Sequence, residues 1–321
     1  MTRPSAVPPP VTAVLDASSR WLPARLGEVE ELLREQGAGY GDLLAADVAT
    51  TLAAGGKRLR PLLVLLCAGP DGGAGTVRAA TAIELIHMAT LVHDDVLDDA
   101  PLRRGLPTIA ATAGRQRATA VGDLLFSRAF ALLGEHDEAR ALELLAAASV
   151  SLADGELAQR RDAFDIGISE QRYLDRCRLK TATLFESACL IGRDLPALGE
   201  FGARIGLAFQ LLDDVLDVSG PVERTGKARG TDLLDGTVTL PLIDAAAADP
   251  SIREADLRAL GTGGAERLCD RIAATGALDR VRSRALELVA GAKAQLAGDA
   301  FDPEQRQLLA LVADGVVQRY S

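Results

Sequence analysis

The chain has 321 residues, of which 48% are hydrophobic and 3% aromatic, and its net charge is −10 at pH 7. The hydrophobic fraction is sufficient for a large buried core, while the excess of acids argues against a nucleic-acid partner, which would require a basic face. Ala and Leu, which favour helices, are abundant, and runs typical of strands are missing. We therefore predict an all-α fold.

The predicted helices follow one another with short interruptions. The Pro-rich residues 1–12 are expected to form a disordered tail, and residues 13–321 a single domain, since no shift in composition marks a boundary. The predicted helices span about residues 12–35 (interrupted near Pro23), 42–54, 62–67, 76–98, 118–133, 138–159, 169–191, 198–218 and 240–247. From about Glu254 we expect further helices rich in Ala and Leu.

No segment predicts secretion or membrane insertion. The N-terminal residues lack the apolar core of a signal peptide. The longest apolar run, residues 62–68, is far shorter than the roughly 20 residues that span a bilayer. Four widely spaced cysteines show no zinc-binding spacing: Cys67, Cys177, Cys189 and Cys269. We expect them to be buried and reduced, in a cytoplasmic protein.

Two acidic motifs with the same spacing follow apolar stretches. The first motif, in LVHDDVLDDAPLRRG, and the second motif, in FQLLDDVLD, contain Asp94, Asp95 and Asp98, and Asp213, Asp214 and Asp217, respectively. Acids at a helix C-terminus are opposed by the macrodipole. A solvated helix end would explain either motif alone. Two copies favour a shared Mg²⁺ site, because Mg²⁺ binds a few carboxylates together with water and substrate phosphates.

Basic residues stand close to glycines and to these motifs. They are Lys57, Arg58, Arg60, Arg103, Arg104, Lys180 and Lys227. Each alone would be explained as a solvated surface cation, but beside two acidic motifs phosphate binding is the better interpretation. Neither a P-loop nor a GxGxxG sequence is present. We therefore predict a diphosphate ester held by metal and basic side chains.

This set of motifs resembles the trans-isoprenyl diphosphate synthases of the polyprenyl synthetase family, with medium or long products. The matching stretches are GGKRLRP, IHMATLVHDDVLDDAPLRRG, GD at 122–123, KTATLFE, FQLLDDVLD and GTDLLDGTVTLP. The resemblance implies an isoprenoid-synthase helical bundle around a deep central cavity, usually a homodimer. It implies Mg²⁺-dependent condensation of an allylic diphosphate with isopentenyl diphosphate, head to tail, to an all-trans polyprenyl diphosphate.

The resemblance also implies roles for individual residues. Mg²⁺ would be bound by Asp94, Asp95, Asp98 and Asp213, with Asp214 and Asp217 acting directly or through water. The allylic diphosphate would be bound by Arg103, Lys180 and Lys227. The diphosphate of isopentenyl diphosphate would be bound by Lys57, Arg60, His87 and Arg104. Thr181 and Gln210 would place oxygen atoms near the developing allylic cation.

Individual positions add three further expectations. His87 shares a helical stripe with the first motif and is expected to bind ligand, whereas His93 and His136 are expected to be structural. The family usually has lysine where this sequence has Thr237, and often where it has Thr231. This loss of charge leaves room for a diverged activity.

Small residues occupy the positions where short-chain members of the family carry a bulky aromatic residue. These are Ala89 and Thr90, and Ile86 and Ala82 lie one and two turns deeper. Because a helical turn rises about 5.4 Å, comparable to one isoprene unit, a deeper plug sets a longer product. Phe126 and Phe130 are candidate plugs, although burial in the core also explains both. We expect a product of C20 or longer, with about C30 to C50 favoured.

Four alternatives stay open. Geranylgeranyl diphosphate synthase differs only in product length, and a class I terpene cyclase would share the fold but cyclise its substrate. A regulatory subunit of a heteromeric synthase would be expected to lose aspartates from the motifs, and here both motifs are intact. A metal-storage or interaction bundle would not explain why arginines and lysines stand close to glycines and to the acidic motifs.

Overall fold

The computed structural model describes residues 9–18, 20–37, 41–53, 58–103, 105–220, 229–298 and 300–318. Helices dominate this part of the chain, which confirms the predicted all-α class. Three residues predicted to bind diphosphate, Lys57, Arg104 and Lys227, lie outside the described residues.

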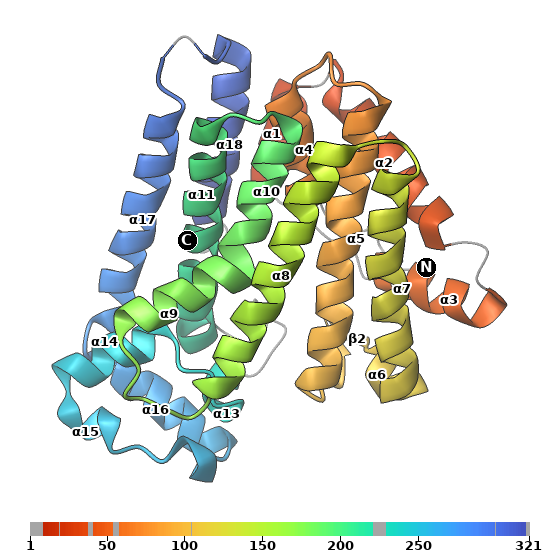
Figure 1. Cartoon of the computed structure of the whole chain (residues 1–321). Coiled ribbons are helices and arrows are strands. Elements are labelled where there is room, and N and C mark those ends of the chain that lie inside the picture. Colours follow the sequence, from red (N-terminus) through yellow and green to blue (C-terminus); the bar gives the residue numbers. More distant parts are fainter. Residues whose placement is uncertain are drawn as a thin grey trace.

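The long helices form a bundle (Figure 1). They are α2 (Leu22–Gly37), α5 (Ala74–Leu97), α7 (Arg115–Gly134), α8 (Ala139–Arg161), α10 (Thr183–Gly192), α11 (Pro196–Ser219), α17 (Ala277–Gln295) and α18 (Pro303–Gln318). Helix α5 packs along α7, and α11 packs along α17 and α10. In Figure 1, α5, α8 and α11 all run toward the lower end of the bundle, so their C-terminal ends gather there.

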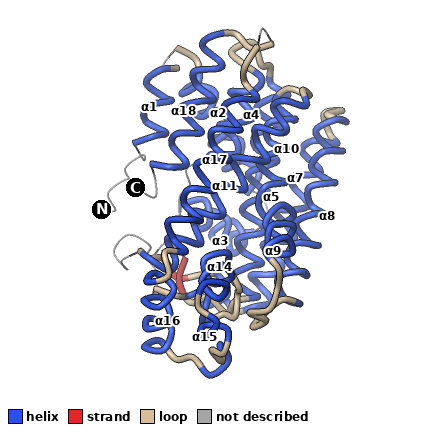
Figure 2. The backbone as a smooth tube through the Cα atoms, turned by 90° about the vertical axis from the view of Figure 1, so that its left-hand side faces the viewer, coloured by secondary structure: helices blue, strands red, loops and turns tan. Residues whose placement is uncertain are grey.

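Shorter elements complete the fold. They are α1 (Pro9–Ala17), α3 (Gly41–Ala53), α4 (Leu59–Ala68), α6 (Ile109–Ala113), α9 (Glu170–Cys177), α13 (Thr231–Leu234), α14 (Leu240–Ala248), α15 (Pro250–Arg253), the 3₁₀ turn η2 (Leu257–Ala259) and α16 (Thr262–Ala274). Helices α15 and α16 lie at the lower end of the molecule in both views (Figures 1 and 2), and α14 packs against both. Helix α4 is buried from Pro61 to Cys67, as its continuous apolar sequence requires.

Two features differ from the sequence-based expectation. Helix α1 begins at Pro9, inside the segment expected to be a tail. A short hairpin, β1 (Leu102–Arg103) paired antiparallel with β2 (Leu106–Pro107), follows the first motif. Its turn contains Gly105 with φ 77, a conformation that favours glycine.

The predicted helix 169–191 is continuous, but it contains a π-helical segment, η1 (Arg178–Ala182), between α9 and α10. This segment is held between α8 and α11 by two close backbone approaches. A Cβ atom at Gly155 of α8 would lie 2.6 Å from the Lys180 nitrogen. One at Gly206 of α11 would lie 2.7 Å from the Ala182 Cα. Only glycine therefore allows η1 to lie this close to both helices.

Replacing Gly155 with Ala is expected to destabilise the protein by about 1–3 kcal/mol, because the added methyl group must displace the η1 backbone. Gly134, at the end of α7, is the matched control, because a Cβ atom added there would meet no packing neighbour within 4 Å. Gly134→Ala is expected to be neutral or slightly stabilising, since it reduces the entropy of the unfolded chain. Urea unfolding of both variants measures the difference. Equal free energies of unfolding would contradict the close approach.

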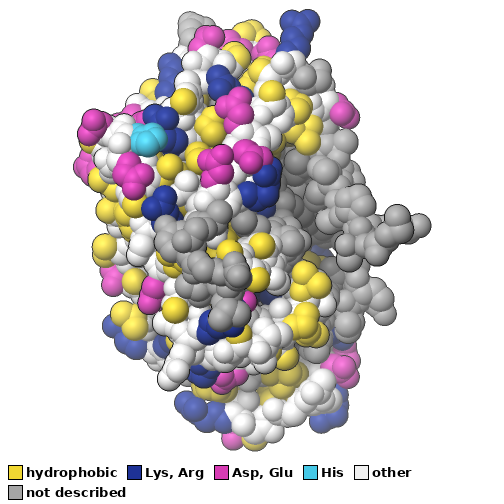
Figure 3. All heavy atoms as spheres, turned by 90° about the vertical axis from the view of Figure 1, so that its right-hand side faces the viewer, with side chains coloured by type: hydrophobic (Ala, Val, Ile, Leu, Met, Phe, Trp, Pro, Cys, Tyr) yellow, Lys and Arg dark blue, Asp and Glu magenta, His cyan; other side chains and the backbone are white. Residues whose placement is uncertain are grey.

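Burial and surface agree with the composition. All four cysteines are free and buried, as expected. Within the described part of the chain, no helix is both long and apolar enough to cross a membrane. On the face shown in Figure 3, acidic and basic side chains lie interspersed among hydrophobic ones.

Candidate active site

The first motif lies at the C-terminal end of α5, close to α8, η1 and the hairpin. Asp95 is buried, and its Oδ1 accepts a hydrogen bond from Arg103 Nε of β1 at 2.7 Å. Burial raises the pKa of Asp94 above its ordinary value, opposed by the charges of Lys180 and Arg103 and reinforced by those of Glu156 and Asp98. Asp94 therefore lies among charges that come from α5, α8, η1 and the hairpin.

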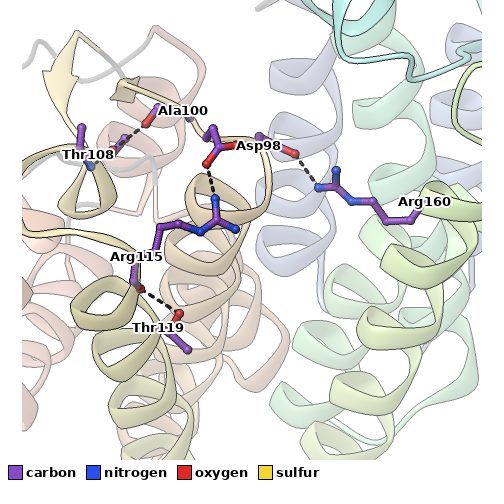
Figure 4. A network of polar contacts seen from close by, with 8 residues as sticks. Asp98, Ala100, Thr108, Arg115, Thr119 and Arg160 are labelled. Carbon is purple, nitrogen blue, oxygen red and sulfur yellow. Dashed lines mark hydrogen bonds and ion pairs between the residues drawn. The ribbon is translucent and has the colours of Figure 1, made fainter.

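Asp98 is the most accessible acid of the first motif and is tied to α8. Its Oδ1 lies 2.6 Å from Arg160 Nη2 (Figure 4). Arg160 Nε donates to Glu156 Oε1 at 2.7 Å. Glu156 Oε2 in turn lies 2.5 Å from Lys180 Nζ. Burial alone would raise the pKa of Glu156, but Lys180 and Arg160 hold it below its ordinary value. The first motif and Lys180, which is predicted to bind diphosphate, thus belong to one ionic network.

The segment after the first motif is fixed by hydrogen bonds. Thr108 Oγ1 donates to the Ala100 carbonyl at 2.6 Å, and Asp99 pairs with Arg115 of α7 (Figure 4). A cavity of about 50 Å³ lies between this segment and α5, and its lining includes His87, Asp95 and Arg103. His87 and Asp95 of the first motif thus line the same cavity.

The second motif, at the end of α11, divides into exposed and buried acids. Asp213 is exposed, and Asp217 is partly buried, with its Oδ2 accepting from the Asp232 N–H at 3.3 Å. Asp214 is buried and accepts hydrogen bonds on both oxygens, from the Tyr173 hydroxyl and from Gln210 Nε2 at 2.8 Å. Of this motif, Asp213 is therefore the acid that faces solvent.

The environment of Asp214 changes its protonation. Burial, with the charge of Asp232, raises its pKa to about 8, although the two hydrogen bonds act in the opposite direction. At neutral pH the folded protein therefore favours the protonated acid. An unfolded chain, in which this carboxyl has its ordinary pKa, favours the ionised form.

This difference predicts a pH dependence of stability in the metal-free protein. Because the folded state binds the extra proton, the carboxyl's contribution is fully present below pH 4 and is lost as the pH rises toward 8. Asp214→Asn removes the titration, so the variant should gain stability relative to the parent over this window, by a few kcal/mol, an order-of-magnitude value. Urea unfolding in EDTA at pH 5 to 8 measures the gap. Parallel curves for the two proteins would contradict the raised pKa.

The π-helical segment η1 links the two motifs. The positive charge of Lys180 acts on Asp94, and Lys180 forms an ion pair with Glu156. The next residue, Thr181, donates a hydrogen bond from Oγ1 to Gln210 Oε1 at 2.7 Å. Gln210 continues to Asp214 of the second motif. Segments of π-helix occur frequently at functional sites. Both acidic motifs are thus connected through two adjacent residues.

Other predicted residues that the structure describes lie on α4, α5 and α7. The guanidinium of Arg60 lies over the Phe185 ring of α10, 4.6 Å from its centroid. On α5, Ala82, Ile86 and Ala89 are fully buried, and Thr90 is partly buried. Phe126 stacks on His93, with ring centroids 5.8 Å apart.

Three residues of the site were missed by sequence reasoning: Glu156, Arg160 and Tyr173. The spacing of Glu156 and Arg160 on one helical face was a signal, since residues four apart are neighbours. Which residues they contact depends on the packing of α8 against α5 and η1, which periodicity does not reveal.

The donors fit a hard divalent cation that brings its own water and phosphate ligands. Among the described residues, no three His, Cys, Asp or Glu side chains form a metal-binding group by themselves. Mg²⁺ commonly uses only one or two carboxylates and completes its shell with water and substrate phosphates. The partly accessible Asp94, Asp98 and Asp213 are donors of this kind.

Comparison with known proteins assigns the family. The family model described as polyprenyl synthetase matches residues 42–270. The chain belongs to the polyprenyl synthetase family. The synthase is therefore a prenyltransferase of the type that makes trans-polyprenyl diphosphates, as the motifs predicted.

Similar proteins cover most of the synthase. Heptaprenyl diphosphate synthase component 2 of Geobacillus stearothermophilus is 40% identical over 82% of this chain and 88% of the relative. Octaprenyl diphosphate synthase of Haemophilus influenzae is 37% identical, covering 81% and 82%. The crystal structure of a Caulobacter crescentus polyprenyl synthase, complexed with calcium and isoprenyl diphosphate, superposes with a TM-score of 0.89 at 34% identity, covering both chains completely. The predicted helical-bundle fold is thereby confirmed.

Proposed function

We propose that the synthase condenses an allylic diphosphate with isopentenyl diphosphate, in the presence of Mg²⁺, to a product of about C30 to C50. The ionic network that joins the first motif to Lys180 carries this proposal. Relatives of 37–40% identity are named heptaprenyl, octaprenyl and nonaprenyl diphosphate synthases. A geranylgeranyl diphosphate synthase of Methanosarcina mazei is 33% identical over 83% of this chain, so a C20 product is the alternative.

We further propose distinct roles for the acids. Asp94, Asp98 and Asp213 would hold Mg²⁺, which would neutralise charge on the departing diphosphate. Asp95 would act through its hydrogen bond with Arg103, which it orients. Asp214 would act through Gln210, because both of its oxygens are occupied by hydrogen bonds in the interior.

The cationic and neutral residues would serve the two substrates. Arg103 and Lys180 would bind the allylic diphosphate, together with Lys227. The diphosphate of isopentenyl diphosphate would be bound by His87 and Arg60, together with Lys57 and Arg104. Thr181 and Gln210 would place their oxygens near the allylic cation, and the released diphosphate would accept the proton lost after condensation.

Product analysis tests this function. Purified protein is incubated with Mg²⁺, labelled isopentenyl diphosphate and one allylic primer at a time, from C5 to C20. We expect polyprenyl diphosphates that depend on both substrates and disappear with EDTA. A cyclic product formed without isopentenyl diphosphate would instead indicate a terpene cyclase.

The same assay tests for a required second subunit. Two relatives, from Geobacillus stearothermophilus and Bacillus subtilis, are named component 2 of heptaprenyl diphosphate synthase. Because both acidic motifs are intact, we expect the chain to be active alone. An inactive chain that becomes active on addition of a second protein would identify it as one component of a heteromeric synthase.

We also propose that the synthase forms a homodimer. Helix α8 exposes Val150 and Leu157, seven residues apart on one face, with 64% and 61% of their surfaces accessible. Light scattering is expected to give a mass of twice 33.6 kDa. A monomer mass, or a dimer unaffected by Leu157→Glu, would exclude this face as the interface.

A further inference from the structure

Helix α8 contributes two charged side chains to the candidate site, both from its C-terminal end. Glu156 and Arg160 are four residues apart and therefore share one helical face. Their side chains are joined, with Arg160 Nε donating to Glu156 Oε1 at 2.7 Å. Glu156 is the more enclosed of the two, with 17% of its side chain accessible compared with 41% for Arg160.

Each member of this pair reaches a different element of the site. Arg160 extends from α8 across to Asp98 at the end of α5, where Nη2 and Oδ1 are 2.6 Å apart (Figure 4). Glu156 uses its second oxygen to bind Lys180 of η1 at 2.5 Å. The guanidinium is thus anchored at Nε by Glu156, while its outer nitrogen neutralises Asp98.

A divalent cation and this guanidinium compete for the same carboxylate. Arg160 places a positive charge within hydrogen-bond distance of Asp98, the position that a metal bound to this oxygen would require. A metal that binds Oδ1 of Asp98 would therefore separate Arg160 from it. Glu156 would keep the freed guanidinium close to the site.

We propose that Arg160 is a positioning residue that acts as the counter-ion of Asp98 and is displaced from it by the divalent metal. The proposal rests on the proposed role of Asp98 as a metal ligand. It explains how the repelling acids of the first motif remain together before metal binds. It also implies that the metal affinity of the synthase is lower than the acids alone would allow.

The expected effect is modest, because both partners are about a third or more accessible and solvent screens the pair. Without Arg160, the Mg²⁺ concentration that half-saturates the site should fall about two- to fivefold. The probe is inorganic pyrophosphate at fixed concentration, with Mg²⁺ varied. Thermal unfolding of the full chain reports the half-saturating Mg²⁺ concentration independently of turnover.

Three variants give a matched comparison. Arg160→Gln should lower the half-saturating concentration, and Arg160→Lys, which keeps the charge, should return it toward the parent value. Arg115→Gln is the control, since Arg115 pairs with the neighbouring Asp99 and its loss removes the same charge from the same region (Figure 4). Arg115→Gln should leave the half-saturating concentration almost unchanged.

Two results would overturn the proposal: an unchanged or higher half-saturating concentration in Arg160→Gln, or an equal decrease in Arg115→Gln. The parent protein separates this failure from that of the proposed function. If the parent forms product and is stabilised by Mg²⁺ with pyrophosphate, only the role of Arg160 is lost. If it does neither, the proposed function itself fails, and the role of Arg160 with it.

Discussion

Replacing Asp94 with Asn is expected to lower kcat/KM by about a thousandfold. Asn has nearly the same shape but lacks the charge that binds metal. The charges of Lys180, Glu156 and Arg103 all act on Asp94. The substitution therefore removes a charge from the middle of the ionic network. Steady-state kinetics with saturating primer and excess Mg²⁺ measure the loss.

Asp99→Asn is the matched control for this experiment. Asp99 lies one residue beyond the first motif, pairs with Arg115 and has 79% of its side chain accessible. Its variant should retain nearly full activity. Burial disfavours the charged form of Asp94, so Asp94→Asn should fold at least as stably as the parent. Activity within tenfold of the parent in folded Asp94→Asn would exclude this residue as an essential metal ligand.

Replacing Ala89 with Phe is expected to shorten the product to about C15 to C20. The ring would close a tunnel for the growing chain, which we propose to run along α5, between one and two turns before Asp94. Ala89 is fully buried, as are Ile86 and Ala82 one and two turns deeper. The same substitution at these two positions should shorten the product progressively less, by about one isoprene unit per turn. Chromatography of the dephosphorylated products measures the series.

The free energies of unfolding of the same three variants distinguish an open tunnel from a packed core. A Phe side chain that enters an open tunnel should cost little, whereas overpacking of a filled core costs about 1–3 kcal/mol. A series with unchanged products and strongly reduced stability would show that this face of α5 does not line the tunnel. The Mg²⁺ dependence of the variants should be unchanged, since none of the substitutions replaces an acid of the two motifs.

The sequence predicted well those features that depend on local patterns. Helices α5 and α11 were predicted at 76–98 and 198–218 and extend from Ala74 to Leu97 and from Pro196 to Ser219. Long apolar stretches bounded by glycine or proline explain this agreement. Both acidic motifs were predicted to occupy helix ends, and His87 to share the stripe of the first motif.

The features that were missed depend on tertiary contacts. The π-helical segment lies inside a stretch whose sequence is that of an ordinary helix, and it is stabilised by packing against Gly155 and Gly206. The partners of Glu156 and Arg160 follow from the position of α8, not from its periodicity. The hairpin after the first motif has only two residues in each strand, too few for an alternating pattern.

The π-helical segment has a consequence for insertions and deletions in this region. A π-turn contains one residue more than the α-turn that it replaces, so deleting a single residue between Arg178 and Ala182 would restore a regular helix. The side chains beyond the deletion would then keep their orientation relative to α9, because the α-turn covers the same rotation with one residue fewer. Helix α10 would keep its packing against α11, whereas the turn that carries Lys180 and Thr181 would be one residue shorter. A one-residue deletion in this segment should therefore disturb the contacts of η1 with the two motifs more than it disturbs the fold.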